Sequence, residues 1–139
     1  MDEKVEYERP FEDEIIYEST HFSVCQDWAL AIPGFYIISP KRKCTTILEF
    51  SDAESVEYIK TVKTIRQAMK EALNIDTVYF FQNEDTPYGF HLWILPYYDW
   101  MKDVAGQGPK ILFPVWKHAK DNMATEEHVA ATRAAAQRM

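Results

Sequence analysis

The sequence predicts an α+β fold in which an antiparallel sheet of about five strands packs against one long helix. Five short segments rich in β-forming residues occur as a group of three and a group of two, and a single helical segment separates the groups. Short links between successive strands favour antiparallel pairing. Strands grouped around one helix, instead of alternating with several, are typical of α+β proteins.

The first three strands are expected at residues 14–18, 21–27 and 35–39. In the second of them, Phe22, Val24 and Gln26 alternate with their neighbours and should share one face of the sheet. Pro33-Gly34 breaks the chain before the third strand, because this pair is typical of a turn.

The long helix is expected at residues 52–73. Ser51 and Glu54 have the spacing of a capping box, in which each side chain binds the backbone amide of the other residue. Asn74 can adopt the left-handed conformation that ends a helix. Apolar residues recur every three or four positions and predict one buried stripe, formed by Val56, Ile59, Val62, Ile65, Met69 and Leu73.

The last two strands are expected at residues 77–82 and 90–95, with a turn-rich stretch between them. A further helix should begin near residue 125, while residues 97–123 give no clear signal. The sequence therefore indicates an acidic N-terminal arm at residues 1–13, a domain at 14–100 and a C-terminal extension at 101–139 that packs on, or continues, the same domain.

Composition limits the class of protein. The chain has 139 residues, of which 47% are hydrophobic, so it is long enough to bury a core. It has no apolar run of membrane-spanning length and no secretory signal pattern. Cys25 and Cys44 could pair, but a cytoplasmic protein with reduced thiols is the simpler interpretation. The spacing of Cys and His residues does not suggest a structural zinc site.

The charge of the chain argues against nucleic acid as a partner. The net charge is −7, and residues 1–14 hold seven acids against Lys4 and Arg9. Non-specific binding of nucleic acid needs a cationic surface. A small nucleotide held in one local pocket is compatible with an acidic chain.

His91 is the strongest candidate for chemistry. A single histidine in a strand is more often structural than catalytic, but the surroundings of His91 are distinctive. Because side chains alternate along a strand, His91, Trp93 and Leu95 should face away from Phe90 and its alternate neighbours. The histidine then shares a face with a large indole ring, which can form the wall of a site.

The stretch Gly89-Phe90-His91-Leu92-Trp93-Ile94-Leu95-Pro96 resembles the signature of the histidine-triad (HIT) nucleotide-binding family. In that signature, three histidines alternate with apolar residues and often run into Leu-Pro. Aligned on Leu95-Pro96, Gly89 stands at the first histidine, His91 at the second and Trp93 at the third. The resemblance extends over roughly residues 14–100 and includes the stretches 24–27, 32–35 and 37–42.

The resemblance implies a HIT-like fold and a nucleotide hydrolase or nucleotidyl transferase. Such an enzyme cleaves a phosphoanhydride or phosphoramidate bond, as a dinucleoside polyphosphate hydrolase does. The second histidine of the family is a nucleophile, so His91 is the expected catalytic residue, attacking the α-phosphorus. The resemblance implies neither a cofactor nor a metal, and it implies a homodimer because family members are commonly dimers.

The resemblance also implies nucleotide-binding residues. Asp27 matches the position that holds the ribose hydroxyls, Asn83 or its neighbour Gln82 matches a polar residue near the phosphates, and Thr86 matches a hydroxyl that can bind a phosphate oxygen. Trp93 would form a wall of the site. An ordinary strand end and turn would also explain these polar residues, and the run Lys41-Arg42-Lys43 suits either a phosphate site or a solvated surface.

The two missing histidines leave three functions open. Gly89 offers only backbone atoms, and Trp93 offers one N–H donor but cannot accept a proton. Loss of acid–base help typically costs ~10²–10⁴ in rate, which leaves a slow enzyme or one that needs a good leaving group. The first alternative is a nucleotide-binding module without turnover, acting as a sensor or partner subunit. The other is an α+β interaction domain unrelated to the family.

Overall fold

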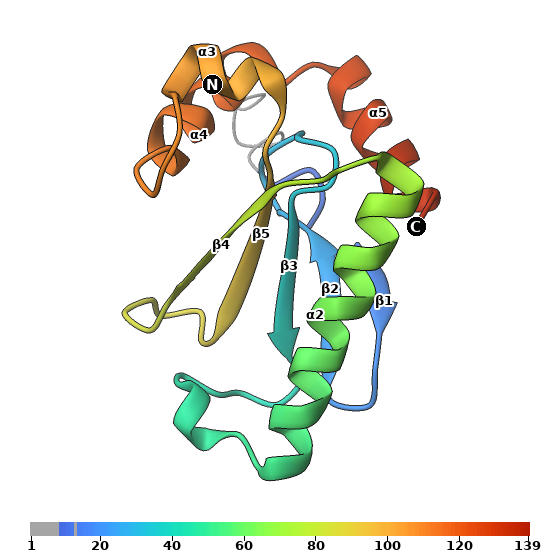
Figure 1. Cartoon of the computed structure of the whole chain (residues 1–139), viewed down its shortest axis with the longest axis vertical. Helices are drawn as coiled ribbons and strands as arrows, with labels where there is room; N and C mark the ends of the chain where they lie inside the picture. Colours follow the sequence, from blue (N-terminus) through green and yellow to red (C-terminus); the bar gives the residue numbers. More distant parts are fainter. Residues whose placement is uncertain (1–8, 13) are drawn as a thin grey trace.

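The computed structural model describes residues 9–12 and 14–139. Five strands form one sheet in the order β1-β2-β3-β5-β4, and every neighbouring pair is antiparallel (Figure 1). The α+β prediction is therefore confirmed. The strands are β1 Ile15–Glu18, β2 Phe22–Gln26, β3 Tyr36–Pro40, β4 Val78–Asn83 and β5 His91–Pro96. The helices are η1 Ile47–Glu49, α2 Asp52–Leu73, α3 Asp99–Ala105, α4 Leu112–Asn122 and α5 Glu126–Gln137.

The two faces of the sheet carry separate hydrophobic clusters. Phe90, just before β5, packs together with Leu92 and Ile94 of β5 and with residues of α2, which lies along one face (Figure 1). Leu95 of β5 belongs to the second cluster, together with residues of α3 and α4, and Trp93 packs against it. The alternation predicted for β5 is confirmed, and it places His91 and Trp93 on the face opposite α2.

Helix α2 begins and ends where the sequence predicts. The Ser51 hydroxyl accepts from the amide of Glu54, the Glu54 carboxylate accepts from the amide of Ser51, and Asn74 ends the helix with φ of 56°. The expected apolar stripe is wrong in the first half of the helix, where Val56 and Ile59 are each 56% exposed. The buried positions are instead Glu54, Tyr58, Thr61, Ile65 and Met69.

The buried face of α2 is rotated because its first turns pack against polar loops and aromatic rings. Tyr58 contacts Phe22, Phe50 and Phe90, with ring centroids 5.6 Å apart in each pair. Glu54, which is 5% exposed, turns toward Arg42. A pattern based on apolar residues alone cannot assign a buried glutamate.

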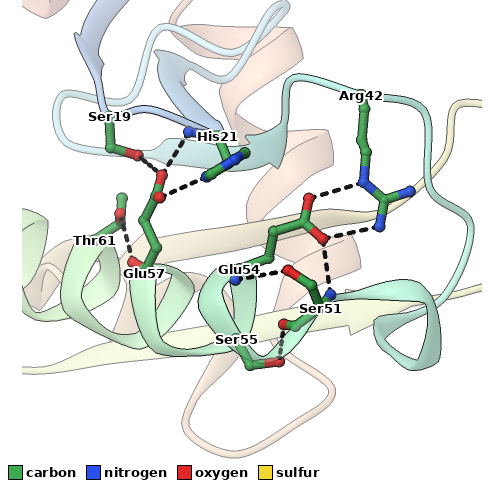
Figure 2. A network of polar contacts seen from close by, with 8 residues as sticks. All are labelled: Ser19, His21, Arg42, Ser51, Glu54, Ser55, Glu57 and Thr61. Carbon is green, nitrogen blue, oxygen red and sulfur yellow. Dashed lines mark hydrogen bonds and ion pairs between the residues drawn. The ribbon is translucent and has the colours of Figure 1, made fainter.

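A network of polar contacts joins α2 to the β1–β2 turn and to the loop after β3 (Figure 2). Arg42 donates from Nε and Nη2 to the two carboxylate oxygens of Glu54, at 2.8 and 2.9 Å, and from Nη2 to the carbonyl of Glu49. One turn further along, Glu57 accepts from the Ser19 hydroxyl and the His21 amide, both at 2.6 Å. These contacts fix the β1–β2 turn and the loop after β3 against the helix.

The C-terminal extension is mainly helical. Residues 97–123, which lead into it, give no clear sequence signal, yet they contain α3 and α4, which lie at the end of the sheet away from η1 (Figure 1). Pro114 is tolerated because it occupies the first turn of α4, where its missing N–H would have no helical partner. Within the described residues, no helix combines the length and apolar character needed to span a bilayer.

The described part of the N-terminal arm is attached to the body of the protein. Phe11 is fully buried, and its amide donates to the carbonyl of Trp28 at 3.1 Å. Arg133 of α5 binds the carbonyl of Pro10 at 2.8 Å and pairs with Glu14. The rest of the expected arm, residues 1–8 and 13, lies outside the described residues.

Acid should destabilise the protein through the contacts of α2. The Arg42 guanidinium holds the pKa of Glu54 at about 2, and the Ser19 hydroxyl and His21 hold that of Glu57 at about 2, against 4.5 ordinarily. Between about pH 4.5 and about pH 2, these carboxylates take up protons in the unfolded chain but remain ionised in the folded protein. The free energy of unfolding therefore decreases as the pH falls through that window. Urea denaturation at a series of pH values measures this loss. Glu54→Gln should flatten the profile, whereas Glu127→Gln, an equal charge change on α5, should not; identical profiles would contradict the role of Glu54.

Candidate functional site

His91 is buried, and its geometry fixes its tautomer. The side chain is 6% exposed, and Nδ1 lies 2.9 Å from the carbonyl oxygen of Gly89. Because a carbonyl can only accept, Nδ1 carries the proton and donates it to this contact. Burial lowers the pKa of His91 below 6.5, although the Gly89 carbonyl opposes the shift. The ring is therefore neutral near pH 7, with its lone pair on Nε2.

Aromatic rings enclose the histidine. The ring of Trp28 meets that of His91 edge-on at 5.7 Å, and the ring of Trp93 lies 5.5 Å away on the same face of β5. Tyr88 packs against Trp28 at 6.0 Å, and the Arg9 guanidinium lies 5.0 Å from the Trp28 ring centroid and 5.7 Å from that of Tyr88. The sequence identified Trp93 but missed Trp28, which follows β2 and reaches His91 only through the fold.

Gly89, which the resemblance aligns with the first histidine of the signature, has no room for a side chain. Its φ is +88°, and a Cβ atom there would lie 2.9 Å from the carbonyl oxygen of Cys44. The same oxygen accepts from the amide of Phe90 at 2.7 Å, so the loop after β3 is bonded to the start of β5. This close approach explains the glycine, whose carbonyl in turn orients His91.

Asp27 is held by three donors. Its Oδ1 accepts from the amides of Ala29 and Leu30, at 3.0 and 2.9 Å, and its Oδ2 accepts from the indole Nε1 of Trp93 at 3.2 Å. Burial raises the pKa of the Asp27 carboxyl, and these hydrogen bonds lower it in part. Asp27 therefore has the structural role of a turn residue, and Trp93 is its side-chain hydrogen-bond donor.

A large cleft lies beside Asp27. Its volume is about 830 Å³, and it contains four of the predicted binding residues, Asp27, Gln82, Asn83 and Trp93. Its other wall comes from the C-terminal extension, through Lys110, Phe113 and Trp116 among others. Phe113 and Trp116 stack with centroids 6.3 Å apart. The sequence missed this wall, because residues 97–123 gave no readable pattern.

His91 lines a hollow with Gly89, Tyr88 and the loop after β3. Asp27 lines the large cleft instead. Trp93 contacts both residues, because it is bonded to Asp27 and packed on His91, and that the two side chains serve one site stays a prediction.

The remaining predicted residues lie on the β4–β5 hairpin. Asn83 is the cross-strand neighbour of His91, which places both side chains on one face, whereas Gln82 pairs with Leu92 of the α2 face. Asn83 donates to Asp85 at 2.6 Å. The Thr86 hydroxyl accepts from the amide of Tyr88 at 2.9 Å, as in an ordinary turn. Among the described residues, no group of three or more His, Cys, Asp or Glu side chains could hold a metal ion.

Comparison with solved structures identifies the fold. A hypothetical histidine triad nucleotide-binding protein from Sulfolobus tokodaii matches with a TM-score of 0.62 and 21% identity, over 88% of this chain and 80% of that one. The chain has the HIT-like fold. A zinc-bound histidine triad family protein from Mycobacterium smegmatis matches with a TM-score of 0.58 and 21% identity, over 89% of this chain and 84% of that one.

A third structure, the NitFhit protein of C. elegans, has a TM-score of 0.61 and 18% identity. The match covers 90% of this chain but only 27% of the NitFhit chain. No protein-family model and no curated protein matches the sequence. The HIT-like fold expected from the residues of β5 is therefore confirmed by structure alone.

Gly89→Ala should destabilise the protein by ~1–3 kcal/mol, because a side chain there combines a left-handed φ with a contact to backbone. Gly108→Ala is the matched control, since Gly108 has φ of +106° but nothing within 4 Å of the position that a methyl group would occupy. Urea denaturation compares the two variants. Equal losses would show that the approach of Cys44 contributes nothing. Gly89→His should likewise destabilise the fold, because its Cβ atom meets the same carbonyl.

Proposed function

We propose that this chain is a degenerate member of the histidine-triad superfamily, a nucleotide hydrolase or nucleotidyl transferase with His91 as its nucleophile. The observation that carries the proposal is the state of His91. A histidine nucleophile needs an unprotonated nitrogen in a fixed tautomer. The Gly89 carbonyl holds the proton on Nδ1, and burial keeps the ring neutral.

The proposed reaction proceeds in two displacements. Nε2 of His91 attacks the α-phosphorus, an N–P bond forms, and the P–O or P–N bond to the leaving group breaks with its electron pair. Water, or a second acceptor, then attacks the same phosphorus and releases the histidine. Neither Gly89 nor Trp93 can deliver a proton to the leaving group, so substrates whose leaving group departs as a stable anion are favoured.

The cleft beside Asp27 is the proposed site for the nucleoside. Aromatic walls provide stacking surface for a planar base. Each carboxylate oxygen can accept more than one hydrogen bond, so Asp27 can bind a ribose hydroxyl through Oδ2 while it retains Trp93. Asn83, the cross-strand neighbour of His91, would then lie near the phosphate. The homodimer implied by the resemblance stays a prediction.

A nucleotide-binding module without turnover is the second candidate. It is favoured by one observation: Trp93 occupies the space between Asp27 and His91, where it can neither give up nor accept a proton in the reaction. In this case the cleft would bind a nucleotide, and the fixed tautomer of His91 would have only a structural role.

His91→Ala should abolish turnover and leave nucleotide affinity nearly unchanged, because the ring acts mainly in the transition state. Turnover of a panel of dinucleoside polyphosphates and phosphoramidates, with calorimetric titration of the monophosphates, separates the two effects. Because the pKa of His91 lies below 6.5, wild-type kcat/KM should fall only below that pH. A nucleotidyl adduct on His91 should be detectable by mass spectrometry at neutral pH. Wild-type turnover by His91→Ala would exclude the nucleophile, and binding without cleavage would support the module.

Asp27→Asn should weaken binding of a ribonucleoside monophosphate by roughly 1.5–3 kcal/mol, the value of a hydrogen bond to a charged group. Asn keeps an oxygen for the amides of Ala29 and Leu30 and so preserves the turn contacts that Asp27→Ala removes, although its amide nitrogen replaces the oxygen that accepts from Trp93. Calorimetric titration with the 2′,3′-dideoxynucleotide is the control, because its affinity should not change. Equal affinity of the wild type for the ribo and dideoxy forms would remove Asp27 from ribose binding.

A further inference from the structure

The hollow that His91 lines is basic. Its volume is about 360 Å³, and its lining residues include three cations, Lys41, Arg42 and Lys43, and no acid. This concentration of positive charge is unusual in a chain whose net charge is −7. A concave surface lined by one sign of charge attracts ligands of the opposite sign.

The basic loop can approach β5 only because residue 89 is a glycine. The Cys44 carbonyl occupies the space where a side chain of residue 89 would lie, and it binds the amide of Phe90. The three cations precede Cys44 directly in the chain. The exchange of histidine for glycine therefore coincides with a cationic loop beside the second histidine.

Two of these three cations are already neutralised. Lys41 pairs with Glu18 at 3.4 Å, and Arg42 binds the carboxylate of Glu54 with two hydrogen bonds (Figure 2). Lys43 is exposed, and no acid among the described residues lies within ion-pair distance of its ammonium group. Lys43 is thus the cation that remains available to a ligand in the hollow.

We propose that this basic hollow is a subsite for the outer phosphates of the substrate, those beyond the attacked phosphorus, and that Lys43 binds them. The inference rests on the proposed function, and it names the substrate class as a phosphoanhydride in preference to a phosphoramidate. The Arg9 guanidinium lies over the ring of Tyr88 at the rim of the hollow, but it pairs with Glu12 at 3.3 Å, so Lys43 remains the available cation.

This subsite would compensate for the lack of a residue that can donate a proton to the leaving group. When the P–O bond of a phosphoanhydride breaks, the leaving phosphate departs with the electron pair as an anion, and no proton is required. A cation placed where that charge develops stabilises the transition state. An amine leaving group, by contrast, needs a proton that Gly89 and Trp93 cannot provide.

Inorganic pyrophosphate and AMP test the subsite in calorimetric titrations of the full chain. Wild type should bind both. Lys43→Met should weaken pyrophosphate binding about 10-fold or more, the equivalent of one charge-assisted hydrogen bond, with little effect on AMP, which has no outer phosphate. Lys43→Arg should retain the affinity. Lys63→Met, an equal charge change at an exposed position of α2, should behave as wild type.

The outcomes separate the two proposals. If pyrophosphate does not bind wild type, or binds Lys43→Met as tightly, the subsite is excluded even where AMP binds. An equal loss in Lys43→Met and Lys63→Met would indicate general electrostatics and would also overturn it. If pyrophosphate binds through Lys43 but neither AMP nor any other nucleoside monophosphate binds, the anion subsite stands and the proposed nucleotide function fails.

Discussion

The ion pair between Arg42 and Glu54 connects the helix to the candidate site. Glu54 belongs to the first turn of α2 and also accepts from the amide of Ser51, so its carboxylate is fixed at the helix start. Arg42, bonded to it at two points, fixes the loop after β3. That loop presents the carbonyl of Cys44 to the amide of Phe90, next to Gly89, whose own carbonyl orients His91. Each of these contacts positions the group that makes the next one.

Backbone and burial, more than neighbouring side chains, control charge and protons at the candidate site. The Gly89 carbonyl fixes the tautomer of His91, and burial keeps its ring neutral. No neighbouring side chain is needed for either effect. Trp93 serves Asp27 as a donor and packs on the ring of His91. Chemistry in such a site has to rely on fixed positive charge instead of proton transfer, and this requirement joins the proposed nucleophile to the proposed phosphate subsite.

Local signals in the sequence predicted the parts of the fold that depend on neighbouring residues. The capping box of Ser51 and Glu54 and the alternation around His91 act within a few residues, and the structure agrees with both. Val56 and Ile59 were assigned to the core because the partner of Glu54, twelve residues away, cannot be seen in a helical pattern. Likewise, Trp28 reaches His91 and α4 walls the cleft only through tertiary packing, so that half of the site could not be predicted.

The tight space at Gly89 couples residue 89 to the loop after β3. A histidine placed at residue 89 would meet the Cys44 carbonyl before it could contribute anything to the site, so any side chain there requires the loop to move first. A loop displaced on its own would lose its hydrogen bond to Phe90 without any gain. Because each change is unfavourable without the other, the two positions are coupled, and a side chain at residue 89 is tolerated only together with a displaced loop.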